Sequence, residues 1–168
     1  MSKIINSMIS SIETYLPEKV LTNDDLSKMV DTSNEWIVSR TGIEKRHIVT
    51  DEFNYDLAVK SAIKTLSTEK IAAKDLDCII VSTTTSADKC PSTATKVQSM
   101  LGAYNAFAFD IQAACSGFIY GLTIADSFIR SGTTSNVLLI GTETMSLVTD
   151  WNDRDRDRKS GSAGMPRP

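Results

Sequence analysis

The chain has 168 residues, of which 41% are hydrophobic and 23% are charged, and its formal net charge is −3 at pH 7. This composition is typical of a globular domain, and the small negative charge argues against nucleic acid as the main partner. No apolar run approaches the roughly 18 residues that a membrane span needs, so no membrane partner is expected. The amino terminus lacks the long apolar core of a signal peptide, and a cytoplasmic location is the expectation.

Near the amino terminus, residues 3–16 carry isoleucines and a methionine among small polar residues, which favours a strand. Thr22 offers an N-cap for a short helix that extends to Val30. Thr32 and Glu35 form a T-x-x-E pattern, which predicts a second helix start with Thr32 as the cap.

Along the rest of the chain, sequence patterns typical of helices alternate with patterns typical of strands. The expected elements are a helix over 53–66, a strand over 78–85, a helix from Pro91 to Gly102, a strand over 107–111, a helix from Cys115 to Gly132 and a strand over 136–141. Such alternation predicts an α/β fold with a mostly parallel sheet and helices on both of its faces.

The three cysteines, Cys78, Cys90 and Cys115, form an odd set without CxxC spacing. This pattern suggests neither a disulfide framework nor a zinc site. Cys78 begins an apolar strand and is expected in the core, whereas Cys90 precedes Pro91 in a loop.

Cys115 stands where the 107–111 strand turns into a helix that is apolar around most of its circumference. The positive end of a helix favours a thiolate over a thiol, and the small residues around Cys115 leave room for a substrate. A buried structural thiol is the alternative, since cysteine is among the most buried residue types. The helix itself is expected to be a central one and not a surface one.

The string D-x-x-x-A-C-S-G-F-x-Y-G-L, which starts at Asp110, resembles the nucleophile turn of β-ketoacyl-acyl-carrier-protein synthase III. Members of this family start fatty-acid chains and have a thiolase-like fold. The resemblance implies that Cys115 is the catalytic nucleophile.

A second resemblance to the same family lies in residues 31–43, D-T-S-N-E-W-I-V-S-R-T-G-I. In the family, the tryptophan of this segment and a later arginine sandwich the adenine of coenzyme A. The resemblance therefore implies a coenzyme A site formed by Thr32, Trp36, Arg40 and Arg154. The residues alone also allow a capped amphipathic turn whose tryptophan packs into the core.

The resemblance covers residues 1–154, which we expect to form the amino-terminal one of the two half-domains of the thiolase-like fold. Residues 155–168 have no apolar periodicity, and an unrelated, disordered tail is expected there. Family members are about twice this length. They take a catalytic histidine and asparagine from the second half. The only histidine of this sequence, His47, does not match the position of that catalytic histidine. We expect His47 to be exposed near the coenzyme A site.

The implied reaction has two stages, with acetyl-coenzyme A as the first substrate and malonyl-acyl-carrier-protein as the second. It implies no metal and no permanently bound cofactor. An acyltransferase that forms homodimers is expected, although this short chain is expected to be inactive or impaired. Cys90 stands where many family members have a phenylalanine that closes the acyl pocket, so a strict preference for acetyl groups is in doubt.

Two alternatives stay open. The chain could be a non-catalytic interaction or dimerisation fragment, or it could belong to another thiolase-fold acyltransferase of the chalcone or hydroxymethylglutaryl synthase type. The segment around Trp36 argues against the second alternative, because those relatives do not share its string.

Overall fold

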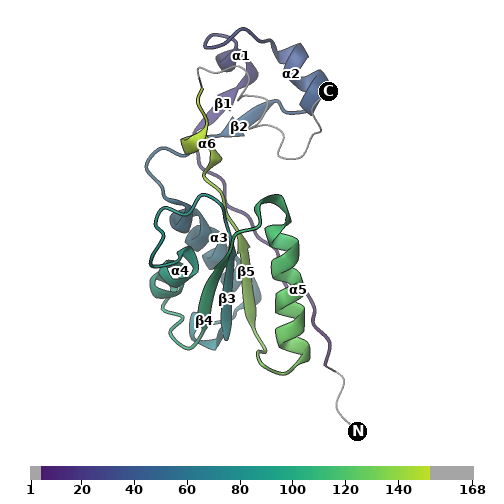
Figure 1. Cartoon of the computed structure of the whole chain (residues 1–168), viewed down its shortest axis with the longest axis vertical. Coiled ribbons are helices and arrows are strands. Elements are labelled where there is room, and N and C mark those ends of the chain that lie inside the picture. Colours follow the sequence, from purple (N-terminus) through teal and green to yellow (C-terminus); the bar gives the residue numbers. More distant parts are fainter. Residues whose placement is uncertain (1–4, 152–168) are drawn as a thin grey trace. The chain divides into compact units, whose positions relative to one another are not determined.

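The computed structural model describes residues 5–151, and these residues form two compact units. Residues 5–15 and 53–143 make up the larger unit, and residues 16–52 and 144–151 make up the smaller one (Figure 1). The tail expected at 155–168 lies outside the described residues.

The larger unit is built on a parallel sheet of three strands in the order β4-β3-β5. The strands are β3 (Cys78–Ser82), β4 (Phe107–Ile111) and β5 (Val137–Gly141). Ser82, Ile111 and Gly141 are in register, so all three strands end at the same level. The predicted parallel sheet is confirmed, and its carboxyl edge is the place where ligands bind in open α/β folds.

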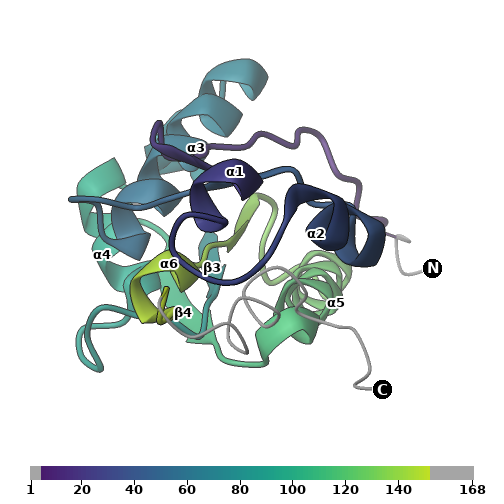
Figure 2. The ribbon, with the colours of Figure 1, turned by 90° about the horizontal axis from the view of Figure 1, so that it is seen from above.

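Helices cover both faces of this sheet, as the alternating pattern predicted (Figures 1 and 2). They are α3 (Asn54–Glu69), α4 (Thr93–Leu101) and α5 (Gly117–Arg130), with a short 3₁₀ turn, η1 (Ala73–Asp75), before β3. Ile79 and Val81 pack in the cluster formed with α3 and α4, whereas Cys78 and Ile80 pack against Ala125 of α5. These four side chains of β3 are fully buried, because successive residues of a strand point to opposite faces and both faces are covered.

The smaller unit contains a two-stranded antiparallel sheet that the sequence patterns did not predict. Its elements are β1 (Val20–Thr22), α1 (Asn23–Leu26), α2 (Asn34–Thr41), β2 (Lys45–His47) and α6 (Met145–Val148). The Thr22 hydroxyl caps α1 as predicted, but the helix ends at Leu26 and does not reach Val30. The predicted cap of α2 is wrong: the side chain of Ser33, and not that of Thr32, accepts the N–H of Trp36 at 3.1 Å.

The strand predicted for residues 3–16 is also wrong, because the described residues 5–15 form no strand. A strand needs a neighbouring strand for its backbone hydrogen bonds, and none of the strands in residues 5–151 pairs with this segment. Side chains of α3 hold it instead: Lys60 bonds the Tyr15 hydroxyl at 3.0 Å, Lys64 bonds the Thr14 carbonyl at 3.0 Å, and Thr68 bonds Glu13 at 2.8 Å. Met8, Ile9 and Ile12 are consequently exposed.

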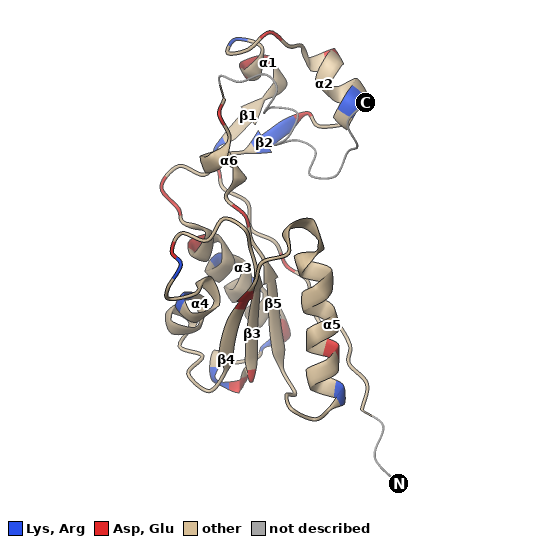
Figure 3. Cartoon of the chain, viewed as in Figure 1, with Lys and Arg blue, Asp and Glu red and all other residues tan. Residues whose placement is uncertain are grey.

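Helix α5 differs from the buried central helix that its composition predicted, because only one of its faces is covered within the described residues. The buried residues of α5 are Gly117, Gly121 and Ala125, which face the sheet. Phe118, Ile119 and Tyr120 are exposed, with Ile119 at 60%. Figure 3 shows that this part of α5 carries no charged residue. No helix in residues 5–151 is long and apolar enough to cross a membrane.

We expect the purified 168-residue chain to associate through this apolar surface, because large exposed apolar patches drive association. Light scattering at micromolar concentration should give a mass above that of the monomer. Ile119→Lys should shift the mass toward the monomer, whereas Ser99→Lys, which places the same charge at an exposed polar position of α4, away from this surface, should not. A monomeric wild-type chain would contradict the expectation.

Candidate active site

Cys115 lies at the carboxyl edge of the sheet, in a short 3₁₀ turn, η2 (Ala114–Ser116), that joins β4 to α5. Helix α5 begins at Gly117 and not at Cys115, so the predicted helix start is two residues too early. The residue before the cysteine, Ala114, has a φ of +46°, which residues other than glycine adopt only at an energetic cost. Unfavourable backbone geometry of this kind is concentrated at functional sites. The turn leaves Cys115 exposed.

Gly117 brings this turn into close contact with the end of β3. A Cβ atom at Gly117 would lie 2.1 Å from the Ser82 Oγ atom, a distance at which the two atoms would overlap. A larger residue at this position would therefore force the Ser82 side chain to move. The first turn of α5 and the last residue of β3 are packed together within two residues of Cys115.

Asp110, the first residue of the motif quoted above, joins β4 to the neighbouring helix. Its carboxylate accepts the backbone N–H groups of Thr93 and Ala94 at 2.8 and 2.7 Å. These N–H groups are at the start of α4, where no intrahelical partner exists for them. Asp110 thus fixes the position of α4 relative to the strand that leads to Cys115.

The three thiols have different surroundings. Cys78 is fully buried in β3, as predicted, and burial, together with the nearby Asp77 carboxylate, raises the pKa of its thiol to about 11. Cys90 and Cys115 are both exposed. The alternative interpretation of Cys115 as a buried structural thiol is therefore wrong, and Cys78 is the cysteine that has this role.

In the smaller unit, α2 carries two of the predicted coenzyme A residues. Trp36 and Arg40 are four positions apart and thus share one face of the helix. Trp36 is half-buried and Arg40 is exposed, whereas the one buried residue of α2 is Ile37. Ile37 therefore packs this helix into the core, and the indole of Trp36 keeps part of its surface accessible.

Thr32 lies just before α2, and its hydroxyl oxygen is buried without a hydrogen-bond partner among the described residues. Buried polar atoms are nearly always satisfied by protein, water or ligand. This oxygen itself has no exposed surface, so a partner for it would have to reach a buried position. Arg154, the fourth predicted residue, lies outside the described residues.

Asn23 holds α2 in place, a role that no sequence pattern indicated. Its side-chain amide donates to the Ile43 carbonyl at 2.7 Å and to Asn34 Oδ1 at 3.0 Å. Its Oδ1 accepts from the Arg46 guanidinium at 2.8 Å. Asn23 is 1% exposed, so these bonds connect both ends of α2 and strand β2 to one buried side chain.

We expect Asn23→Ala to destabilise the smaller unit by about 3 kcal/mol, because it leaves several buried polar groups without partners. Trp36 and Trp151 both belong to this unit, so tryptophan fluorescence during urea unfolding measures its stability. Ser39→Ala removes only an exposed bond from a hydroxyl to the Trp36 carbonyl and should change the stability by less than about 0.5 kcal/mol. Equal stability of Asn23→Ala and Ser39→Ala would contradict the role of Asn23.

His47 is half-buried in β2, and its Nδ1 atom donates to the Pro17 carbonyl at 2.6 Å. The expectation of an exposed histidine was therefore wrong, because the neighbouring chain segment covers the ring. This bond gives His47 a structural role.

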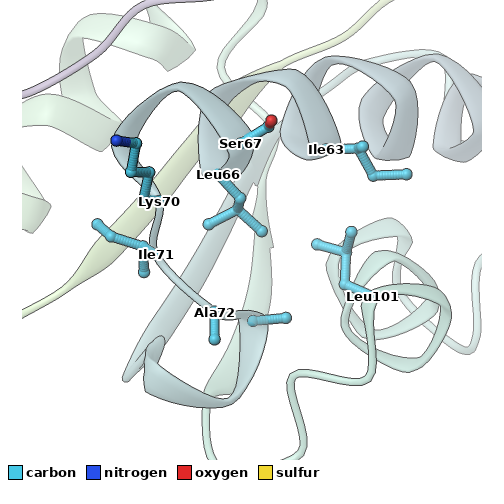
Figure 4. A pocket seen from close by; sticks show the side chains of 8 residues that line it. Ile63, Leu66, Ser67, Lys70, Ile71, Ala72 and Leu101 are labelled. Carbon is cyan, nitrogen blue, oxygen red and sulfur yellow. The ribbon is translucent and has the colours of Figure 1, made fainter.

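A groove of about 500 Å³ lies elsewhere in the larger unit, between α3, the segment after it and the end of α4 (Figure 4). Its lining consists of Ile63, Leu66, Ser67, Lys70, Ile71, Ala72, Ala73 and Leu101. None of the candidate site residues is among them. The groove is thus separate from the Cys115 turn.

Comparisons with known proteins agree with this geometry, and they place the fold among the thiolase-like synthases. The crystal structure of 3-oxoacyl-[acyl-carrier-protein] synthase III from Aquifex aeolicus VF5 matches with a TM-score of 0.83 and 50% sequence identity, over 91% of this chain and 48% of that one. The family model for 3-oxoacyl-[acyl-carrier-protein] synthase III matches residues 109–161.

Curated relatives lead to the same family. The β-ketoacyl-[acyl-carrier-protein] synthase III of Xanthomonas campestris pv. campestris (strain 8004) is 52% identical over 155 residues, which are 92% of this chain and 48% of the relative. The synthase III of Ehrlichia canis (strain Jake) is 54% identical over 149 residues, or 88% and 47%. The chain belongs to the β-ketoacyl-[acyl-carrier-protein] synthase III family, and it spans about half the length of the curated relatives it matches.

Proposed function

We propose that this chain carries the acyl-accepting part of a β-ketoacyl-acyl-carrier-protein synthase, an acyltransferase of fatty-acid synthesis. The observation that carries the proposal is the exposed Cys115 in its turn at the carboxyl edge of the sheet. In the first stage, the Cys115 thiolate attacks the thioester carbonyl of acetyl-coenzyme A. The bond to the coenzyme A sulfur then breaks, coenzyme A leaves as a thiolate, and the acetyl group remains on Cys115 as a new thioester.

Coenzyme A is proposed to bind at α2, with its adenine on the face of Trp36. The flat indole suits a purine, and Arg40, on the same face of the helix, suits a phosphate group. The Thr32 hydroxyl offers a hydrogen bond, and Arg154 is proposed to stack on the opposite side of the adenine. Acetyl-coenzyme A enters as a substrate, so this reaction needs no resident cofactor.

In the second stage, malonyl-acyl-carrier-protein loses carbon dioxide, and the resulting carbanion attacks the Cys115 thioester to give a β-ketoacyl product. The family resemblance assigns this stage to a histidine and an asparagine. The only histidine of this sequence, His47, is bonded to Pro17 and does not match. We therefore propose that residues 1–168 alone accept the acetyl group but do not condense it.

A non-catalytic role in assembly is the second candidate, and the exposed apolar face of α5 favours it. Under this proposal the chain pairs with a second copy or with a full-length synthase. The chain can have both the acyl-accepting role and the assembly role only if Cys115 also reacts with acetyl-coenzyme A.

Radiolabelled acetyl-coenzyme A tests the proposed function directly. We expect label on Cys115, identified by peptide mapping, and no β-ketoacyl product when malonyl-acyl-carrier-protein is added. A chain that associates but takes no label would refute the acyl-accepting role and leave the assembly role. Formation of product would show that condensation does not need the histidine and asparagine that the family resemblance assigns to it.

A further inference from the structure

Three consecutive threonines, Thr83, Thr84 and Thr85, follow β3, and all three have a hydrogen bond to one carboxylate, that of Glu143 after β5. Glu143 Oε1 accepts the Thr84 N–H at 2.8 Å and the Thr84 hydroxyl at 3.0 Å. Glu143 Oε2 accepts the Thr85 hydroxyl at 2.5 Å, with a longer contact of 3.5 Å from the Thr83 hydroxyl. Bonds to a charged acceptor are stronger than bonds between neutral groups. Glu143 therefore fixes the path of the chain beyond β3.

This threonine segment, residues 83–85, is connected to both sides of the Cys115 turn. The Thr83 N–H donates to the Ile111 carbonyl at 3.1 Å, four residues before Cys115. Ser82, directly before the segment, packs against Gly117, two residues after Cys115. The Ser82 carbonyl also accepts the Thr142 N–H at 3.1 Å, so the end of β3 is bonded to the residue directly before Glu143.

We propose that Glu143 is a positioning residue for Cys115, which acts by holding the threonine segment against the turn. This inference rests on the proposed function, because it assigns a support to the proposed nucleophile. The positive φ of Ala114 gives the reason that a support is needed: a backbone conformation of this kind persists only where the surrounding structure holds it. Glu143 supplies part of that hold through the threonine segment.

Hydrogen exchange measured by mass spectrometry tests the proposal without any substrate. In Glu143→Ala, we expect the amides of the peptide around Cys115 to exchange about 10-fold faster, because the charge-assisted bonds that stabilise the threonine segment are lost. Glu143→Gln should stay within about threefold of the wild type, since its amide can still accept from Thr84 and donate to the Thr85 hydroxyl. Glu13→Ala is the matched control, because it removes another carboxylate–threonine bond of the larger unit.

Alkylation by iodoacetamide separates positioning from general loss of structure. Cys78 is buried at the opposite end of β3, so its alkylation reports unfolding of the core. The proposal requires faster exchange at the Cys115 turn while Cys78 stays unreactive. It is overturned if exchange at the turn is unchanged in Glu143→Ala, if Glu143→Gln is as impaired as Glu143→Ala, or if Cys78 becomes reactive in parallel.

Acetylation adds a readout that depends on the proposed function. If the wild type accepts acetyl groups, Glu143→Ala should lower the maximal acetylation rate about 10-fold and leave the KM for acetyl-coenzyme A unchanged. A raised KM at an unchanged maximal rate would contradict positioning of the thiol. If the wild type accepts no acetyl group, the proposed function fails, whereas the exchange and alkylation results still decide the role of Glu143.

Discussion

Cys115→Ala is expected to abolish acetyl transfer from acetyl-coenzyme A to the chain, a loss of at least about 10⁴-fold, because no other group at the turn can form the thioester. The substitution removes one exposed sulfur atom, so the fold should not change. The measurement is the mass of the intact protein after incubation with acetyl-coenzyme A. It should rise by one acetyl group in the wild type and stay unchanged in Cys115→Ala.

Cys90→Ala is the matched control, since Cys90 is the other exposed thiol of the larger unit. This variant should acquire the acetyl group at the wild-type rate. Acetylation that persists in Cys115→Ala, or that disappears in Cys90→Ala, would show that Cys115 is not the acceptor.

Trp36→Ala should weaken coenzyme A binding 5- to 150-fold, which corresponds to the roughly 1–3 kcal/mol that stacking of a base on an aromatic side chain contributes. The half-buried position of the indole on the face of α2 shared with Arg40 is the reason for this expectation. Calorimetric titration of the purified chain with coenzyme A gives the dissociation constants. Arg40→Ala is expected to lose less affinity for coenzyme A than Trp36→Ala, because an exposed charge interacts with phosphate through water.

Trp36→Phe keeps an aromatic face and should retain most of the affinity. Fluorescence of Trp151, which bonds the Ser146 carbonyl within the same unit, shows whether each variant is folded. Equal affinity of wild type and a folded Trp36→Ala would exclude stacking on this residue.

Local sequence patterns determined much of the fold of this chain. The alternation of apolar segments predicted β3, β4 and β5 and the helices between them, because period and turn residues are local properties. Gly102 was predicted to end its helix, and it has a positive φ, which glycine adopts at little cost. The string around Cys115 indicated a nucleophile turn, and the family comparisons agree with that resemblance.

Contacts between distant residues decided the rest. Thr32 and Ser33 are equally good caps by type, and the path of the backbone selects Ser33. The apolar residues near the amino terminus form a strand only if a partner strand is present, which no local pattern reveals. Asn23 and Glu143 have their roles because segments more than ten residues apart in sequence meet at their side chains. Hydrogen bonds of this kind depend on tertiary position, and for that reason only the structure could identify these two residues.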